Sequence, residues 1–148
     1  MKTVHKSVLI WYSATEMFAL VTDIPSYPQF LPWCDRALVV EETPQGVIAK
    51  LGISMAGLSK TFTTRNIHEQ GRKVSLKLVD GPFSKLDGHW SFAPVGQGEK
   101  RACKVDFHLS YDFDNAALAA LVGPVFDKIA GSLVDAFVKR AEQVYGEA

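Results

Sequence analysis

The chain has 148 residues, of which 47% are hydrophobic and 22% are charged. This composition is typical of a globular protein, and the length suffices to bury a core without metals or disulfides, so we expect one domain over residues 1–148. Lys plus Arg and Asp plus Glu each total 16, giving a net charge of +0. This balance gives no general attraction to nucleic-acid backbones, and we expect no DNA partner.

The N-terminus has no signal-peptide pattern, and no run of about 18 uncharged apolar residues is found, so we expect a soluble protein. The only cysteines are Cys34 and Cys103, which suits a reducing cytoplasm. We expect both to be small buried residues, because no signature of a cysteine nucleophile surrounds Cys34.

The first elements are a strand and two short helices. Residues 3–10 alternate and are rich in β-branched side chains, which predicts a strand. Ser13 and Glu16 have capping-box spacing and predict the start of a short amphipathic helix. Pro28 and Pro32 then break an unusually apolar segment into short turns.

A series of strands follows, separated by turn signals. The predicted strands span residues 37–42, 47–55, 60–69, 73–79, 85–93 and 103–113. Their close spacing favours antiparallel hairpins over crossover helices. In the last strand one face is apolar and the other polar, which is typical of a sheet covered on one side only.

The remainder is predicted to be a long amphipathic helix from Asn115, a natural N-cap, to about Tyr145. Gly123 and Pro124 interrupt the pattern, so either the helix kinks there or a short helix gives way to a main one. The predicted fold is α+β: a curved antiparallel sheet of about seven strands wrapped around the C-terminal helix, with space between the two.

Several ordered motifs resemble the coenzyme-Q-binding branch of the START-like, polyketide cyclase-like helix-grip superfamily, whose bacterial relatives include ribosome-association toxins. They are the stretches at 23–28 and 30–34, Phe62-Thr-Thr-Arg-Asn66, Asp80-Gly-Pro-Phe83, Leu86-x-Gly-x-Trp90 and Pro124-Val-Phe126. The resemblance implies a protein that binds ubiquinone or a related polyprenyl lipid under the long helix. Such a protein would act as a chaperone or carrier supporting respiratory electron transport.

A polyprenyl quinone requires a long, mostly apolar cavity with few polar groups, and apolar side chains around the gap between sheet and helix are the natural lining. We expect the cavity and an aromatic lid to be formed by Tyr27, Phe30, Leu31, Trp33, Phe62, Asn66, Phe83, Leu86, Trp90, Phe107, Tyr111, Val125, Phe126 and Ile129. Arg65 or Asn66 could contact the polar head group. Strand parity places these two on opposite faces, so both cannot face the cavity without a bulge.

Some features of the sequence can also be explained by folding alone, without a role in ligand binding. The turn at Asp80–Phe83 could be structural only, and the apolar residues 27–33 could form a satellite cluster under a loop rather than a lid that touches a membrane. His5, His68, His89 and His108 lack the spacing of metal ligands.

No nucleophile-elbow, P-loop or dinucleotide motif is found in the sequence, so we expect no enzyme and no catalytic cofactor. Two alternatives remain: a translation inhibitor that binds a ribosomal subunit, and a cyclase or dehydratase suggested by fold analogy alone. We expect a cytoplasmic protein that contacts the inner membrane at its periphery when lipid is transferred.

Overall fold

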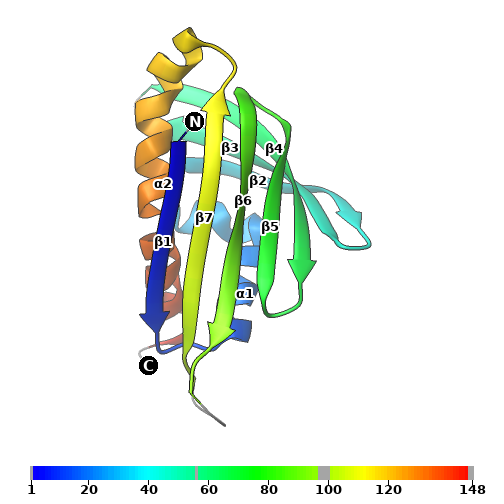
Figure 1. The fold of residues 1–148 in the computed structure, drawn as a ribbon, viewed down its shortest axis with the longest axis vertical. Helices are drawn as coiled ribbons and strands as arrows, with labels where there is room; N and C mark the ends of the chain where they lie inside the picture. The colour runs from blue at the N-terminus through cyan, green and yellow to red at the C-terminus, as the bar shows by residue number, and fades with distance from the viewer. Residues whose placement is uncertain (1, 56, 97–100, 147–148) are drawn as a thin grey trace.

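The structure, a computed structural model, describes residues 2–55, 57–96 and 101–146. The chain forms one seven-stranded antiparallel sheet, two short helices and a long C-terminal helix (Figure 1). In chain order the elements are β1 (Lys2–Ile10), α1 (Ala14–Thr22), the 3₁₀ helix η1 (Ile24–Gln29), β2 (Cys34–Thr43), β3 (Gly46–Met55), β4 (Leu58–Glu69), β5 (Lys73–Asp80), β6 (Phe83–Pro94), β7 (Cys103–Phe113) and α2 (Ala116–Tyr145). The predicted α+β helix-grip fold is confirmed.

The strand order is β1-β7-β6-β5-β4-β3-β2, so the first strand pairs with the last and all other neighbours are joined by hairpins or short loops. Register shifts in the pairing leave single unpaired residues in β2, β5 and β6. Bulges of this kind bend a strand and increase its twist. The sheet therefore curves, and its concave side receives the helices (Figure 1).

The first helix begins where the capping box predicted it. The Ser13 hydroxyl accepts from the Glu16 amide at 3.0 Å, and the Ser13 amide donates to Glu16 Oε1 at 2.9 Å. Glu16 also receives two hydrogen bonds from Arg101, which precedes β7. The hydrogen bond from Arg101 lowers the pKa of Glu16 to about 2, so this carboxylate joins α1 to the sheet at neutral pH.

The β5–β6 turn explains the glycine in the Asp80–Phe83 motif. Gly81 has φ +153°, and a Cβ added to it would lie 2.8 Å from the Cβ of Phe62. Only glycine tolerates both the conformation and the close approach. The turn thus lies close to β4 without displacing the side chain of Phe62.

The C-terminal helix is one continuous element of 30 residues. The Asn115 side chain accepts from the Leu118 amide at 2.9 Å, as a predicted N-cap should. Pro124 lies inside the helix, where it cannot donate to the carbonyl of Ala120. Figure 1 shows the first turns of α2 set at an angle to the rest, so the kinked alternative describes the helix.

One side of α2 packs on the concave face of the sheet. The buried helix residues are Val122, Gly123, Phe126, Ile129, Ala130, Val134, Phe137 and Ala141. By length and composition α2 is also the only described helix that could cross a membrane. The core helix of a folded domain passes the same test, and in this fold α2 covers the sheet.

Phe126 is the centre of an aromatic cluster between α2 and the sheet. Its ring lies 4.9 Å from that of Phe83 and 4.7 Å from that of Tyr111, with Phe62 and Phe113 slightly farther away. Nearly perpendicular rings at these distances attract each other through their quadrupoles in addition to the area they bury.

We predict that Phe126→Ala lowers the free energy of unfolding by about 3–5 kcal/mol, because it leaves a cavity among four rings. Leu121→Ala on the same helix is the matched control: Leu121 is 61% exposed, and its loss should cost about 0.5 kcal/mol or less. Urea denaturation followed by circular dichroism measures both. Equal losses in the two variants would show that the cluster does not stabilise the helix on the sheet.

Candidate functional site: an apolar cavity under the long helix

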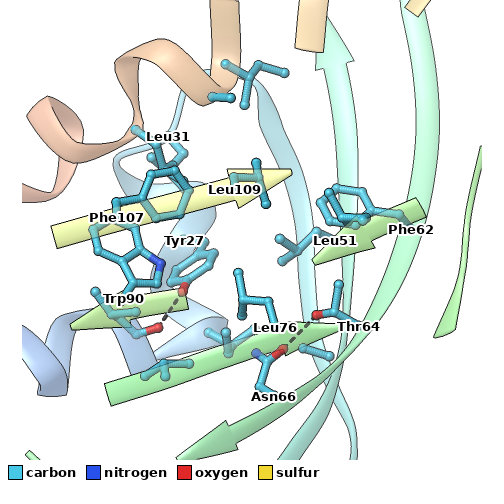
Figure 2. A pocket seen from close by; sticks show the side chains of 18 of the residues that line it. Tyr27, Leu31, Leu51, Phe62, Thr64, Asn66, Leu76, Trp90, Phe107 and Leu109 are labelled. Carbon is cyan, nitrogen blue, oxygen red and sulfur yellow. Dashed lines mark hydrogen bonds between the residues drawn. The ribbon is translucent and has the colours of Figure 1, made fainter. Parts of the chain in front are cut away.

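A cavity of about 80 Å³ lies between the concave face of the sheet, α2 and the segment that contains η1. Figure 2 shows side chains from opposite walls pointing into it. The strands contribute inward-facing residues two apart, because side chains alternate along a strand. Helix α2 closes the cavity with Phe126, Ile129 and Phe137, which lie on one face of the helix.

Most of the residues predicted for the site line this cavity. They are Tyr27, Leu31, Trp33, Phe62, Asn66, Leu86, Trp90, Phe107, Phe126 and Ile129. That they bind a ligand remains a prediction, because the structure establishes their position only. Their convergence from sheet, helix and loop nevertheless gives the apolar enclosure expected of a small-molecule site.

Other predicted residues lie outside the cavity wall. Phe83 and Tyr111 are buried in the aromatic cluster on Phe126, and Val125 is half-buried beside them on α2. Phe30 packs on Phe137 from outside the cavity, with ring centroids 5.1 Å apart. These residues support the wall rather than line it.

The position of Arg65 contradicts its predicted contact with the polar head group of a ligand. It is exposed, on the face of β4 opposite to that of Asn66. The parity argument is therefore right: β4 has no bulge between the two residues that would turn both inward. A head-group contact from Arg65 inside the cavity is not compatible with this position.

Sequence reasoning missed several lining residues. They are Val21, Ile24, Ala49, Leu51, Thr64, Val74, Leu76, Leu109, Ala130, Leu133 and Phe137. Most are aliphatic, and strand alternation could have found those on the sheet, since each lies two positions from another inward residue.

Among the described residues, the cavity wall contains only one ionisable side chain, that of Tyr27. The Tyr27 hydroxyl donates to the carbonyl of Val21 (Figure 2). Burial raises the pKa of this phenol well above its usual range. It therefore remains neutral and hydrogen-bonded, and it serves to fix the η1 segment on α1.

The cysteines and histidines also lie away from the cavity wall. Cys34 and Cys103 are buried, and burial raises the pKa of both thiols, to about 11 for Cys103. A raised pKa disfavours the reactive thiolate. His5, His108 and His89 stack across three strands on the outer face of the sheet, with centroids 3.9 and 4.7 Å apart. Within the described residues no group with the composition of a metal site is found.

The polar feature of the wall is a hydrogen-bonded pair on β4. The Thr64 hydroxyl donates to Asn66 Oδ1 at 2.7 Å (Figure 2). These two are the only buried polar or charged side chains among the described residues, at 5% and 3% exposed. An otherwise apolar cavity thus presents one amide.

Residues 27–33, hereafter the lid, close the cavity on the side of α2. Trp33 lines both the cavity and a surface groove formed with Pro32, Ser132 and Ala136. Its indole is therefore the partition between the cavity and the outside. The end of the lid is attached to β3, where the Ser54 amide donates to the Trp33 carbonyl at 2.8 Å.

Arg140 on α2 fastens the other end of the lid. Its guanidinium donates to Gln29 Oε1 at 2.8 Å and lies 5.0 Å from the centroid of the Phe30 ring. A hydrogen bond and a cation–π contact both stabilise the packing of the lid on α2. Both contacts join the lid to α2 rather than to the sheet.

Similar proteins agree with this geometry. A family model described as "Polyketide cyclase / dehydrase and lipid transport" matches residues 10–138, and the chain belongs to this family. Its fold is that of a START superfamily protein from Mycobacterium smegmatis, with a TM-score of 0.75 at 23% identity over 96% of this chain and 98% of that one.

Two relatives are more specific in their names. "Ribosome association toxin RatA" of Escherichia coli is 43% identical over 145 residues, which cover 98% of this chain and 90% of the relative. "Coenzyme Q-binding protein COQ10 homolog B, mitochondrial" of Xenopus laevis is 27% identical over 142 residues, which cover 95% of this chain and 58% of that protein. The resemblance to a START-like branch containing both kinds of protein is confirmed.

We predict that Arg140→Met loosens the lid. Loss of about 1 kcal/mol of lid contacts should speed amide hydrogen exchange at Leu31 and Cys34 roughly fivefold, because both amides take part in hydrogen bonds that hold the lid.

Lys139→Met is the control, since Lys139 is exposed on the same helix and has no hydrogen bond to the lid among the described residues. Exchange should be measured by mass spectrometry of peptides. Identical exchange in both variants would contradict a fastening role for Arg140.

Proposed function

We propose that the protein binds ubiquinone or a related polyprenyl lipid in the cavity under α2 and acts as a chaperone or carrier. The observation that carries the proposal is the nature of the cavity: an apolar enclosure between sheet, helix and lid with a single amide in its wall. Such a site offers burial to a hydrocarbon tail and one orienting hydrogen bond to a polar head. The relative named as a coenzyme-Q-binding protein supports this ligand class.

Catalysis is not part of the proposal. A cyclase or dehydratase needs a proton donor or acceptor whose pKa suits the reaction, placed beside the substrate. Among the residues described in the wall, Tyr27 is the only titratable one, and its hydroxyl is already used by Val21. The site therefore supports binding better than chemistry.

Binding must be accompanied by opening. The cavity of about 80 Å³ is smaller than the roughly 150 Å³ of an engineered protein cavity that holds benzene. A substituted quinone head and its tail therefore need the lid to move outward from α2. We infer that exchange takes place in the cytoplasm or at the surface of a membrane, where the apolar lid meets the lipid that the protein carries.

The test is direct. Protein purified without detergent should yield an isoprenoid quinone on organic extraction and mass spectrometry. Added short-tailed ubiquinone should quench tryptophan fluorescence and raise the melting temperature, because a ligand that binds only the folded state stabilises it. Trp33 and Trp90 line the cavity and are the expected reporters.

The control variant is Leu133→Trp. A larger side chain at this lining position should fill the space the ligand needs, so quinone should no longer bind. Absence of quinone in the extract, together with no thermal shift and no quenching in the unmodified protein, would refute the proposal.

Association with the ribosome is the second candidate function, and it is favoured by the relative named as a ribosome association toxin. Ribosomal RNA attracts exposed cations that have no carboxylate partner. Arg65 and Lys77 are paired across β4 and β5 on the exposed face of the sheet, with Asp87 of β6 opposite Lys77 and in an ion pair with Lys85. This is a small basic site on a chain with no net charge.

If this function holds, the protein should sediment with a ribosomal subunit in sucrose gradients at low salt. The double variant Arg65→Glu, Lys77→Glu should stay near the top of the gradient as free protein. Lys128→Glu on α2 should sediment as the unmodified protein does. Gradient profiles in which the protein never accompanies a subunit would exclude this candidate.

A further inference from the structure

The polar pair in the cavity wall is incompletely satisfied. Asn66 is 3% exposed, and its Oδ1 accepts from the Thr64 hydroxyl. For the two N–H groups of its Nδ2 no acceptor is found in the described part of the chain. Nδ2 nevertheless keeps some accessible surface. The unused donors therefore border free space, and the free space at Asn66 is the cavity.

Buried amides are normally hydrogen-bonded, and one left partly unpaired needs an explanation. Figure 2 shows the Asn66 amide near Leu76, with its oxygen turned to Thr64 and its nitrogen turned away from it. Apart from Thr64, the side chains labelled near it in Figure 2 are hydrocarbon and cannot accept. A ligand atom that accepts a hydrogen bond would complete the pair.

The cavity wall contains few hydrogen-bond acceptors. No Asp, Glu or His is among the residues that line the cavity in the described structure. One of the two lone pairs of Asn66 Oδ1 is already engaged by the Thr64 hydroxyl. The wall therefore offers fewer hydrogen-bond acceptors to the hydroxyl groups of a ligand than it offers donors to the carbonyl groups of a ligand.

We propose that Asn66 makes the cavity selective for the oxidation state of its ligand, with Nδ2 donating to a carbonyl oxygen of the oxidised quinone. This inference rests on the proposed function. A quinone carries two carbonyl oxygens that only accept hydrogen bonds. A quinol carries two hydroxyl groups, each of which is also a donor that needs an acceptor. Thr64 is the positioning residue, because its hydrogen bond holds the amide with the nitrogen toward the ligand.

Three probes separate this inference from the proposed function: a ubiquinone with two isoprene units, its quinol under anaerobic conditions, and a hydrocarbon of the same tail without a head. Quinone affinity is measured by tryptophan quenching and the others by competition. The unmodified protein should bind quinone on the order of tenfold more tightly than quinol, the factor expected for one good hydrogen bond.

Asn66→Leu should bring this ratio close to one while hydrocarbon binding persists. Thr64→Val, which has nearly the same shape, should also reduce the ratio, because the freed amide can turn its oxygen to the ligand. Arg65→Gln, on the opposite face of the same strand, is the control and should keep the ratio of the unmodified protein.

A ratio that is unchanged in Thr64→Val and Asn66→Leu, with all three probes still bound, would overturn the role of Asn66 and leave lipid binding intact. If Asn66→Leu does not fold, the ratio in Thr64→Val decides the question by itself. Failure of the unmodified protein to bind any probe would overturn the proposed function and the inference together.

Discussion

One geometric constraint determines this structure: the long helix α2 is too narrow to cover the concave face of a seven-stranded sheet by itself. Strands about 4.8 Å apart give a sheet about 29 Å wide, whereas a helix with its side chains is only about 10–12 Å across. The sheet must curve, and α1 and η1 must cover what α2 leaves open. Even so, side chains from three directions do not fill the middle completely. The cavity is the space that remains when these elements are packed around a curved sheet.

The periodicity of the sequence predicted this arrangement because each period reports a physical face. Alternation along residues 103–113 identified the inward residues of β7, and the same parity separated Asn66 from Arg65, of which the structure buries Asn66 and exposes Arg65. The sequence left the state of α2 at Pro124 open. A proline removes one helical hydrogen bond, but burial decides whether the helix continues. Val122 and Phe126 are both buried, on either side of the proline, and their packing on the sheet carries the helix through.

The composition of the cavity wall was harder to predict, because parity identifies a face and not a depth. Tyr111 and Leu109 are both inward on β7, yet Tyr111 packs on Phe126 and Leu109 borders the cavity. The difference lies in what α2 places opposite each residue, which the strand alone does not encode. Aromatic rings that attract one another in perpendicular pairs fill space efficiently. Much of the wall is therefore left to aliphatic side chains such as Leu51 and Leu76.

Two features at one place are unfavourable for a domain that only has to fold. A cavity of about 80 Å³ costs about 2 kcal/mol at the rate found for core cavities. A buried amide with unused donors adds to that cost. Leucine at position 66 would remove the second cost and reduce the first, and the rest of the core shows that hydrocarbon is tolerated on this face. Both costs are relieved together when an accepting, largely apolar molecule enters. Their coincidence beneath the lid is what distinguishes a binding site from imperfect packing.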